Sequence, residues 1–288
     1  MTRINPLIET EELAAAQDVL LFDVTAGNVA DNGGAEITAS QGFRAGHIPA
    51  ARWLDQASQL SDLQSPYKFI SPTLAQITRV FTGLGVSDSS TVVLYSQNGY
   101  GWPTRVWWLL QSIGFHRARI LNGGLQKWRK EGRPLEQGDA SPSALSAGEL
   151  TLKPQPIFVD AERVQLTIGA SDSTLIDALS PQHYRGEAAG KYGRSGHIPG
   201  ALNVPADTLI GDDHRFLAAS SLRERFYQAG AIADKPLLTY CGAGIAASVD
   251  AFAARLAGWE AITIYDASLA QWAADPAFPL EPAGQPSV

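Results

Sequence analysis

The sequence predicts an α/β protein built from two tandem copies of one domain, each with a parallel-sheet core and helices on both faces. Two observations support this fold class. The string Gly46–Ala51 recurs as Gly196–Ala201, and short apolar runs alternate with helical patterns in each half. The chain of 288 residues is long enough for two domains, since one domain commonly takes roughly 150 residues.

The duplication extends beyond the repeated string. Matched residues include Asp23 and Asp177, Ser96 and Cys241, and Trp128 and Trp272. The separation between partners shrinks gradually along the chain, as changes in loop length between related halves would produce. His47 and His197 begin the same motif in both halves. Because the half without a Cys also has this His, we expect both to be structural hydrogen-bonding residues.

Eight apolar runs bounded by turn residues are expected to form buried parallel strands. They are Val19–Asp23, Ala51–Leu54, Thr91–Tyr95, Ala118–Leu121, Thr174–Asp177, Ala201–Val204, Pro236–Tyr240 and Ala261–Tyr265. Pro72–Leu84 and Pro103–Ile113 are expected helices, since Pro suits a first helical turn. A further helix is expected after Cys241, where apolar residues recur at helical spacing. They are Ile245, Val249, Phe252 and Leu256.

A segment rich in Ser, Ala, Gly and Pro separates the halves and has no apolar periodicity. This composition is typical of a linker between domains. We therefore expect an N-terminal domain at 1–135, a linker at 136–156 and a C-terminal domain at 157–288.

Composition and charge exclude several classes of function. The net charge of −7 and the pI near 5.2 disfavour nucleic acid and anionic membranes as partners. Neither a signal peptide nor a membrane span is apparent in the sequence. A single Cys forms no intramolecular disulfide, which favours a reduced, cytoplasmic compartment. The five His and one Cys lack metal-ligand spacing, so we expect neither a metal nor a cofactor.

The most informative residue is Cys241, which lies between an expected buried strand and a Gly-rich turn that begins a helix. Ligands of open α/β sheets bind outside the carboxyl ends of the strands. The turn can direct backbone amides at the sulfur, and the helix N-terminus adds positive charge. We therefore expect a depressed pKa and a nucleophilic thiolate; a buried structural Cys is the alternative. The expected anion-binding residues are Gly242, Ala243, Gly244, Ile245, Ala246 and Ala247.

The duplicated layout, both Gly-His-Ile-Pro strings, Arg105–Trp108 and the Cys turn resemble the two-domain rhodanese sulfurtransferases. The resemblance implies two rhodanese-like domains with the active site between them. It implies that Cys241 takes a sulfane sulfur from a small-molecule donor as a persulfide and passes it on. The acceptor would be cyanide or a thiol, thioredoxin among them. The first domain would be inert, and Ser96 stands there in place of the Cys.

The turn favours one donor over another. Thiosulfate-using relatives carry basic side chains just after the Cys, whereas Gly242 is uncharged here and resembles the 3-mercaptopyruvate sulfurtransferases. That family holds the donor carboxylate with arginines, whose fork suits a carboxylate. Arg185 matches the first, and we assign the second to Arg194, with Lys191 as the alternative. Asp55 matches the acidic member of the family's Ser–His–Asp relay.

The other members of that relay are missing. Ala243 and Phe69 stand where the mercaptopyruvate enzymes have a hydroxyl residue and a His, and Ala246 replaces a second hydroxyl residue. Thiolate formation would then depend on the backbone. A thiosulfate sulfurtransferase and a non-enzymatic binding or redox-sensing module remain alternatives. A phosphatase is disfavoured, because Ala247 replaces the Arg that ends the Cys loop of the related tyrosine phosphatases.

Overall fold

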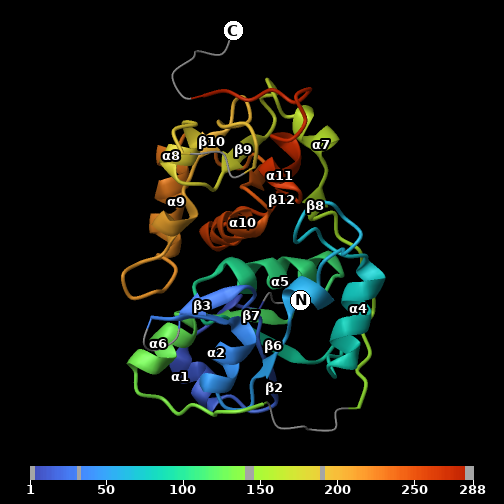
Figure 1. The fold of residues 1–288 in the computed structure, drawn as a ribbon, viewed down its shortest axis with the longest axis vertical. Helices are drawn as coiled ribbons and strands as arrows, with labels where there is room; N and C mark the ends of the chain where they lie inside the picture. Colours follow the sequence, from blue (N-terminus) through green and yellow to red (C-terminus); the bar gives the residue numbers. More distant parts are fainter. Residues whose placement is uncertain (1–3, 31–33, 140–145, 189–191, 283–288) are drawn as a thin grey trace. The chain divides into compact units, whose positions relative to one another are not determined.

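The computed structural model describes residues 4–30, 34–139, 146–188 and 192–282, and Figure 1 shows its ribbon. The contacts divide the chain into two compact units. The first comprises the chain up to residue 61, 72–155 and 212–215, and the second comprises 62–71, 156–211 and the chain from residue 216. The segment 62–71 therefore belongs to the second unit although first-unit residues flank it in the sequence. The segment 212–215 belongs to the first unit although second-unit residues flank it.

The expected linker is attached to the first unit over the residues that the structure describes. The Gly148 amide donates to the Thr82 carbonyl at 2.8 Å, and the Lys153 amide donates to the Ile113 carbonyl at 2.9 Å. Both bonds involve backbone groups, so they leave no mark on the side-chain pattern. The bounds of the two compact units consequently differ from the domain boundaries expected at 135 and 157.

Each unit contains a five-stranded parallel sheet, and equivalent strands follow the same order. The first sheet runs β1 (Leu7–Ile8), β7 (Ala118–Leu121), β6 (Thr91–Tyr95), β2 (Val19–Asp23) and β5 (Arg52–Trp53). The second runs β8 (Phe158–Val159), β12 (Ile262–Tyr265), β11 (Leu237–Tyr240), β9 (Thr174–Asp177) and β10 (Leu202–Asn203). The predicted duplication thus holds for the sheet topology.

The helices of the first unit are α1 (Thr10–Ala15), α2 (Ala39–Ala45), α3 (Gln56–Gln59), α4 (Leu74–Gly83), α5 (Gly101–Ser112) and α6 (Gly124–Lys130). Those of the second are α7 (Ala161–Gln165), α8 (Pro181–Tyr184), the 3-10 helix η1 (Ala206–Leu209), α9 (Ala219–Gln228), α10 (Ile245–Ala257) and α11 (Ser268–Trp272). Pro103 lies in the first turn of α5, as expected, whereas Pro72 precedes the N-cap Thr73 of α4.

The fold class is confirmed as α/β with parallel-sheet cores. Every residue of β9 and β11 is buried, and because successive side chains point to opposite faces, both faces of this sheet are covered. All eight expected strands are present: β2, β6, β7 and β9 have the expected bounds, whereas β5, β10, β11 and β12 are shorter. The strands β1 and β8 were not anticipated, because two residues carry no pattern. An antiparallel pair, β3 (Asn28–Ala30) with β4 (Glu36–Thr38), was also missed.

The two predicted structural histidines make equivalent contacts. His47 Nδ1 lies 2.9 Å from the Phe43 carbonyl, and its ring stacks on Phe43. His197 Nδ1 lies 2.8 Å from the Tyr184 carbonyl, and its ring stacks on Tyr184. Their structural role is confirmed in both units.

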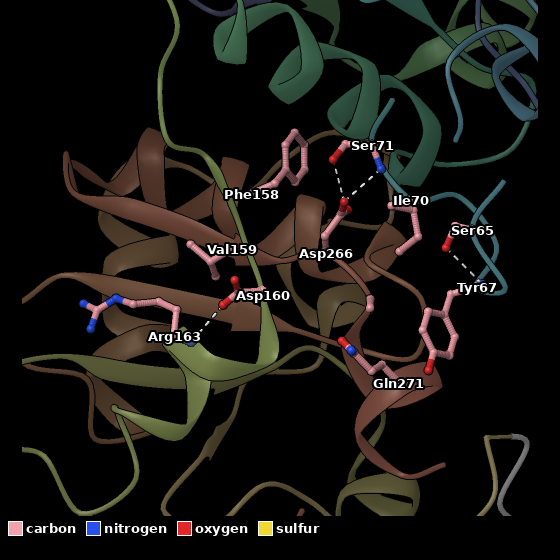
Figure 2. A pocket seen from close by; sticks show the side chains of 11 residues that line it. Ser65, Tyr67, Ile70, Ser71, Phe158, Val159, Asp160, Arg163, Asp266 and Gln271 are labelled. Carbon is pink, nitrogen blue, oxygen red and sulfur yellow. Dashed lines mark hydrogen bonds between the residues drawn. The ribbon is translucent and has the colours of Figure 1, made fainter. Parts of the chain in front are cut away.

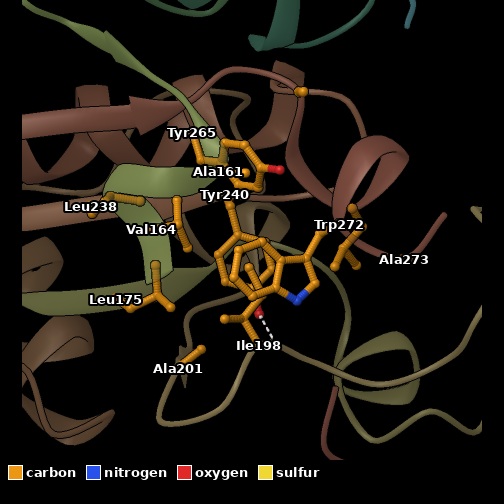
Figure 3. Packing of buried hydrophobic residues seen from close by; sticks show 12 residues of the cluster. Ala161, Val164, Leu175, Ile198, Ala201, Leu238, Tyr240, Tyr265, Trp272 and Ala273 are labelled. Carbon is orange, nitrogen blue, oxygen red and sulfur yellow. Dashed lines mark hydrogen bonds between the residues drawn. The ribbon is translucent and has the colours of Figure 1, made fainter. Parts of the chain in front are cut away.

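The core of the second unit positions the end of β11 (Figure 3). Buried Tyr240, the last residue of the strand, accepts a hydrogen bond from the Ile198 amide on its hydroxyl at 3.0 Å. Trp272 fills the adjoining space and donates from Nε1 to the Pro279 carbonyl at 2.7 Å. The residue that follows Tyr240 is therefore held at the carboxyl edge of a well-packed sheet.

Candidate active site

Cys241 occupies the carboxyl end of β11, a strand paired on both sides, with β9 and with β12. Its side chain is only 2% exposed. The chain then turns sharply, with Gly244 at φ +77° as the N-cap of α10, a conformation that favours glycine. The predicted arrangement of strand, Cys, Gly-rich turn and helix is present.

The first turn of α11 fixes the backbone of this Cys turn. The Leu269 amide donates to the Cys241 carbonyl at 3.0 Å, and the Ala270 amide donates to the Gly242 carbonyl at 2.9 Å. The Ser268 hydroxyl accepts from the Cys241 amide at 3.1 Å. Ser268 has φ +51°, close to φ +54° at the equivalent Gly124, so a residue with a side chain holds a backbone conformation typical of glycine.

Opposing influences act on the Cys241 thiol. Burial raises its pKa most strongly, and the buried Asp177 carboxylate raises it further. Hydrogen bonds from the amides of Ala247, Ala243 and Ala246 lower it, and the result lies above the ordinary value. Three of the six residues expected to bind an anion, Ala243, Ala246 and Ala247, thus direct amides at the sulfur. The expected depressed pKa is wrong, because desolvation of a fully buried thiolate outweighs these three amides.

This balance predicts the pH dependence of alkylation at Cys241. We expect the iodoacetamide reaction rate to rise with pH and to reach half its maximum at a higher pH than that of N-acetylcysteine, because only the thiolate reacts. Stopped-flow mass analysis of both thiols measures this. A midpoint below that of the free thiol would show that the amides dominate.

The two arginines predicted to bind a donor already have partners. Arg185, at the end of α8, has a side chain that is 41% exposed and pairs with Glu187, from Nε at 2.7 Å and from Nη2 at 2.8 Å. The Arg194 guanidinium donates to backbone carbonyls after α11, at Trp272 (3.0 Å), Ala273 (3.2 Å), Asp275 (2.5 Å) and Phe278 (2.8 Å). Arg194 therefore anchors the segment that follows α11, which the sequence assignment did not anticipate.

Two further residues were predicted to bind the donor, Lys191 and Asp55. Lys191 lies outside the described residues. Asp55 belongs to the first unit, where its carboxylate caps α3 by accepting from the Ala57 amide at 3.1 Å and from the Ser58 hydroxyl at 2.6 Å.

Sequence reasoning missed three residues near the thiol: Asp177, Tyr192 and Ser268. The pKa of buried Asp177 is raised to about 6, chiefly by burial. Tyr192 lies over Gly242 so closely that a carbon added there would be 2.3 Å from its ring. The repeat offered a signal for two of them, since Asp177 matches Asp23 and Ser268 matches Gly124. No pattern marked Tyr192.

The equivalent turn of the first unit lacks a thiol and is closed by its own side chains. The Ser96 hydroxyl donates to the Gly99 carbonyl at 2.5 Å. The Gln97 side chain donates to the Asp23 carboxylate and to the Ala39 carbonyl, both at 3.0 Å. This turn lacks the nucleophile of its counterpart, and its Gln97 amide is already bound to the Thr25 hydroxyl at 2.9 Å.

A groove of about 600 Å³ opens in the second unit beside the ends of β8 and β12 (Figure 2). Asp266 accepts from the Ser71 amide at 2.8 Å and from its hydroxyl at 2.5 Å, which fixes the 62–71 segment against the end of β12. Arg163, at the start of α7, is also among the lining residues. Ala267 also lines the groove and directly precedes Ser268, so the groove adjoins the support of the Cys turn.

The described residues include neither a membrane-spanning helix nor a cluster of metal ligands. None of the helices in 4–30, 34–139, 146–188 and 192–282 is long and apolar enough to cross a membrane. The same part of the chain contains no group of three or more His, Cys, Asp or Glu placed to hold a metal ion.

Comparisons with known proteins agree with this architecture. A family model described as a rhodanese-like domain matches residues 9–131 and 160–275. The thiosulfate sulfurtransferase of Azotobacter vinelandii is 32% identical over 249 residues, which cover 85% of this chain and 89% of that protein. The probable 3-mercaptopyruvate sulfurtransferase of Pseudomonas aeruginosa is 30% identical, covering 95% and 97%. The crystal structure of SseA from Escherichia coli, a 3-mercaptopyruvate sulfotransferase, has a TM-score of 0.78 at 27% identity, covering 92% and 99%.

Proposed function

The chain belongs to the rhodanese-like family of sulfurtransferases, and on that premise we propose that it takes sulfur from 3-mercaptopyruvate onto Cys241. The observation that carries the proposal is the cradle in which the amides of Ala243, Ala246 and Ala247 donate to the sulfur. Such a cradle stabilises an anion at the thiolate and at the persulfide that follows it. The nucleophile thus belongs to the C-terminal domain, 157–288, and Ser96 leaves the domain at 1–135 without one.

The proposed first half-reaction conserves atoms and charge. The Cys241 thiolate attacks the sulfur of 3-mercaptopyruvate, an S–S bond forms and the C–S bond breaks. The electron pair of the broken bond goes to the methylene carbon as the pyruvate enolate. The proton of the donor thiol then moves to that carbon, leaving pyruvate and the Cys241 persulfide anion.

Charge in the turn supports this donor. Gly242 and Ala243 add no cation beside the sulfur, whereas thiosulfate would bring a dianion. Arg185 is exposed and pairs with Glu187, which is also exposed, and a surface ion pair of this kind is weak. The Arg185 guanidinium can therefore release Glu187 and bind the donor carboxylate instead. Arg194 holds the neighbouring backbone in this proposal, because its Nε and Nη2 already donate to carbonyls.

The second half-reaction passes the outer sulfur to cyanide or to a thiol, and thioredoxin is a protein thiol of the required kind. We place the reaction in the cytoplasm, where thiols stay reduced, because the lone Cys of the chain cannot be protected within an intramolecular disulfide. Thiosulfate is the second candidate donor, favoured by the name of the Azotobacter vinelandii relative.

Intact-mass analysis tests the proposal, since the chain has a single Cys. Protein treated with 3-mercaptopyruvate should gain the mass of one sulfur atom and release one pyruvate, and cyanide should remove the added mass. Thiosulfate, tested in parallel with sulfite release as the readout, should load the protein more slowly. Faster loading by thiosulfate would reverse the donor assignment, and no gain with either donor on folded protein would refute the mechanism.

A further inference from the structure

Tyr192 closes one side of the Cys241 turn. A side-chain carbon at Gly242 would lie 2.3 Å from Cε2, Cζ and Oη of Tyr192, a distance that real contacts do not reach. The phenol ring therefore occupies the place where a side chain at 242 would begin. Position 242 directly follows the nucleophile, so Tyr192 excludes a side chain from the residue next to Cys241.

The residues that follow Tyr192 hold it in this place. Gly193, at φ +105°, packs against the Ala273 carbonyl, which would lie 3.2 Å from an added side-chain carbon. Arg194 donates to the carbonyls of Trp272 and Ala273. Both contacts are made to the end of α11, whose first turn also fixes the Cys241 carbonyl. The phenol and the sulfur are therefore positioned by the same short helix.

The Tyr192 hydroxyl is a neutral hydrogen-bond donor that lies against Gly242, the residue directly after Cys241. Burial raises the pKa of Tyr192, and the negative charge of the Cys241 thiolate raises it further. Both influences keep the hydroxyl protonated. Within the part of the chain that the structure describes, this hydroxyl makes no hydrogen bond, so its proton is available to a ligand in the turn.

We propose that Tyr192 is a specificity-determining residue, which closes position 242 to side chains and donates its phenol hydrogen bond to the carbonyl oxygen of an α-keto thiol donor. This inference rests on the function proposed above and adds the group that selects the donor.

The chemistry of the two donors differs where this hydroxyl acts. When the C–S bond of 3-mercaptopyruvate breaks, negative charge develops on the carbonyl oxygen of the enolate, where a fixed donor stabilises the transition state most. Thiosulfate instead releases sulfite, a dianion that calls for a cation. A neutral phenol serves the first reaction and not the second.

Comparing Tyr192→Phe with the wild-type enzyme tests the hydroxyl while keeping the ring. We expect kcat/KM for pyruvate release from 3-mercaptopyruvate to fall by about 10- to 100-fold, somewhat less than the loss of a buried oxyanion donor. Sulfite release from thiosulfate should change by less than about threefold. Equal losses with both donors, or no loss with either, would overturn the proposed role of the hydroxyl.

A double-mutant cycle tests the ring. Gly242→Ala should lower the thermal midpoint of unfolding in the wild-type background, because the new methyl group collides with the phenol. In the Tyr192→Ala background the same change should have little effect, since the space is then open. Equal effects in the two backgrounds would show that the ring does not close position 242.

Failure of this inference is distinguishable from failure of the proposed function. If wild-type protein gains sulfur from 3-mercaptopyruvate and Tyr192→Phe gains it equally fast, the persulfide mechanism stands and the Tyr192 role is wrong. If wild-type protein gains no sulfur from either donor, the proposed sulfur transfer through Cys241 is wrong. The double-mutant cycle then still shows whether the Tyr192 ring closes position 242.

Discussion

Replacing Cys241 with Ser is expected to abolish sulfur transfer from either donor, a loss on the order of 10⁴-fold or more. A serine hydroxyl cannot form a persulfide, and its proton is far harder to remove than that of a thiol. Because the chain has a single Cys, no neighbouring thiol can compensate. Pyruvate release, sulfite release and the sulfur mass gain should all fall to background.

The fold should survive this substitution. The amides of Ala243, Ala246 and Ala247, which donate to the sulfur, can donate to a serine oxygen instead. The equivalent turn of the first unit already carries Ser96, with its hydroxyl bonded to a backbone carbonyl. We therefore expect the free energy of unfolding to change by no more than about 1 kcal/mol, as measured by urea denaturation.

Moving the thiol to the other turn provides the matched control. In the double variant Cys241→Ser, Ser96→Cys the only thiol occupies the equivalent position of the first unit, where the Gln97 amide is already bound to the Thr25 hydroxyl at 2.9 Å. We expect no persulfide there. Sulfur transfer by Cys241→Ser alone would contradict a Cys241 intermediate, and transfer by the double variant would contradict the requirement for the amide cradle.

The fold was largely predictable because its signals are local. Apolar runs such as Thr91–Tyr95 and Thr174–Asp177 match the observed strands end to end, since parallel strands buried on both faces need continuous apolar residues. The string Gly46–Ala51, repeated as Gly196–Ala201, indicated in addition that the two halves share one topology. Strands of two residues, such as β1 and β8, left no signal, because their pairing depends on partners far along the chain.

The candidate site was predictable only in part, since its remaining features depend on distant contacts. The Cys241 turn could be read locally, but its depth of burial could not, and burial reversed the expected direction of the thiol pKa. Tyr192 lies 50 residues before the glycine that it covers. The sequence assigned Arg194 as a donor-binding arginine, yet its guanidinium donates hydrogen bonds to the carbonyls of Trp272 and Phe278.

Replacing Asp177 with Asn is expected to stabilise the protein at about pH 8 by roughly 1–3 kcal/mol, with little effect at about pH 4. Asp177 is fully buried, and burial raises its pKa from 3.8 to about 6. A carboxyl group with a raised pKa favours the folded state only while it is protonated. Its contribution is therefore complete below about pH 4 and is lost as the pH rises through about 6.

The hydrogen bonds of Asp177 permit an amide in its place. One carboxylate oxygen accepts from the Leu179 amide at 2.9 Å. Among the described residues the other oxygen makes no hydrogen bond of normal length, and only a longer interaction with the Tyr240 hydroxyl lowers the pKa of Asp177. Asn can keep the first contact and place its NH₂ group at the second position. The neutral side chain also removes a charge that raises the Cys241 pKa, so the alkylation midpoint of Cys241 should move to lower pH.

Asp23 provides the opposite case at the equivalent position of the first unit. Its pKa is also raised to about 6 by burial, but both oxygens accept hydrogen bonds, one from the Thr25 hydroxyl and amide and the other from the Gln97 side chain. In Asp23→Asn the new NH₂ group would face a donor, which costs about 1–3 kcal/mol, offsetting the gain from removing the charge.

Urea denaturation at both pH values should therefore show a pH-dependent gain in the free energy of unfolding for Asp177→Asn and none for Asp23→Asn. Equal gains in the two variants would mean that burial alone decides the outcome, and no gain at position 177 would mean that the carboxylate is better solvated than its surroundings indicate.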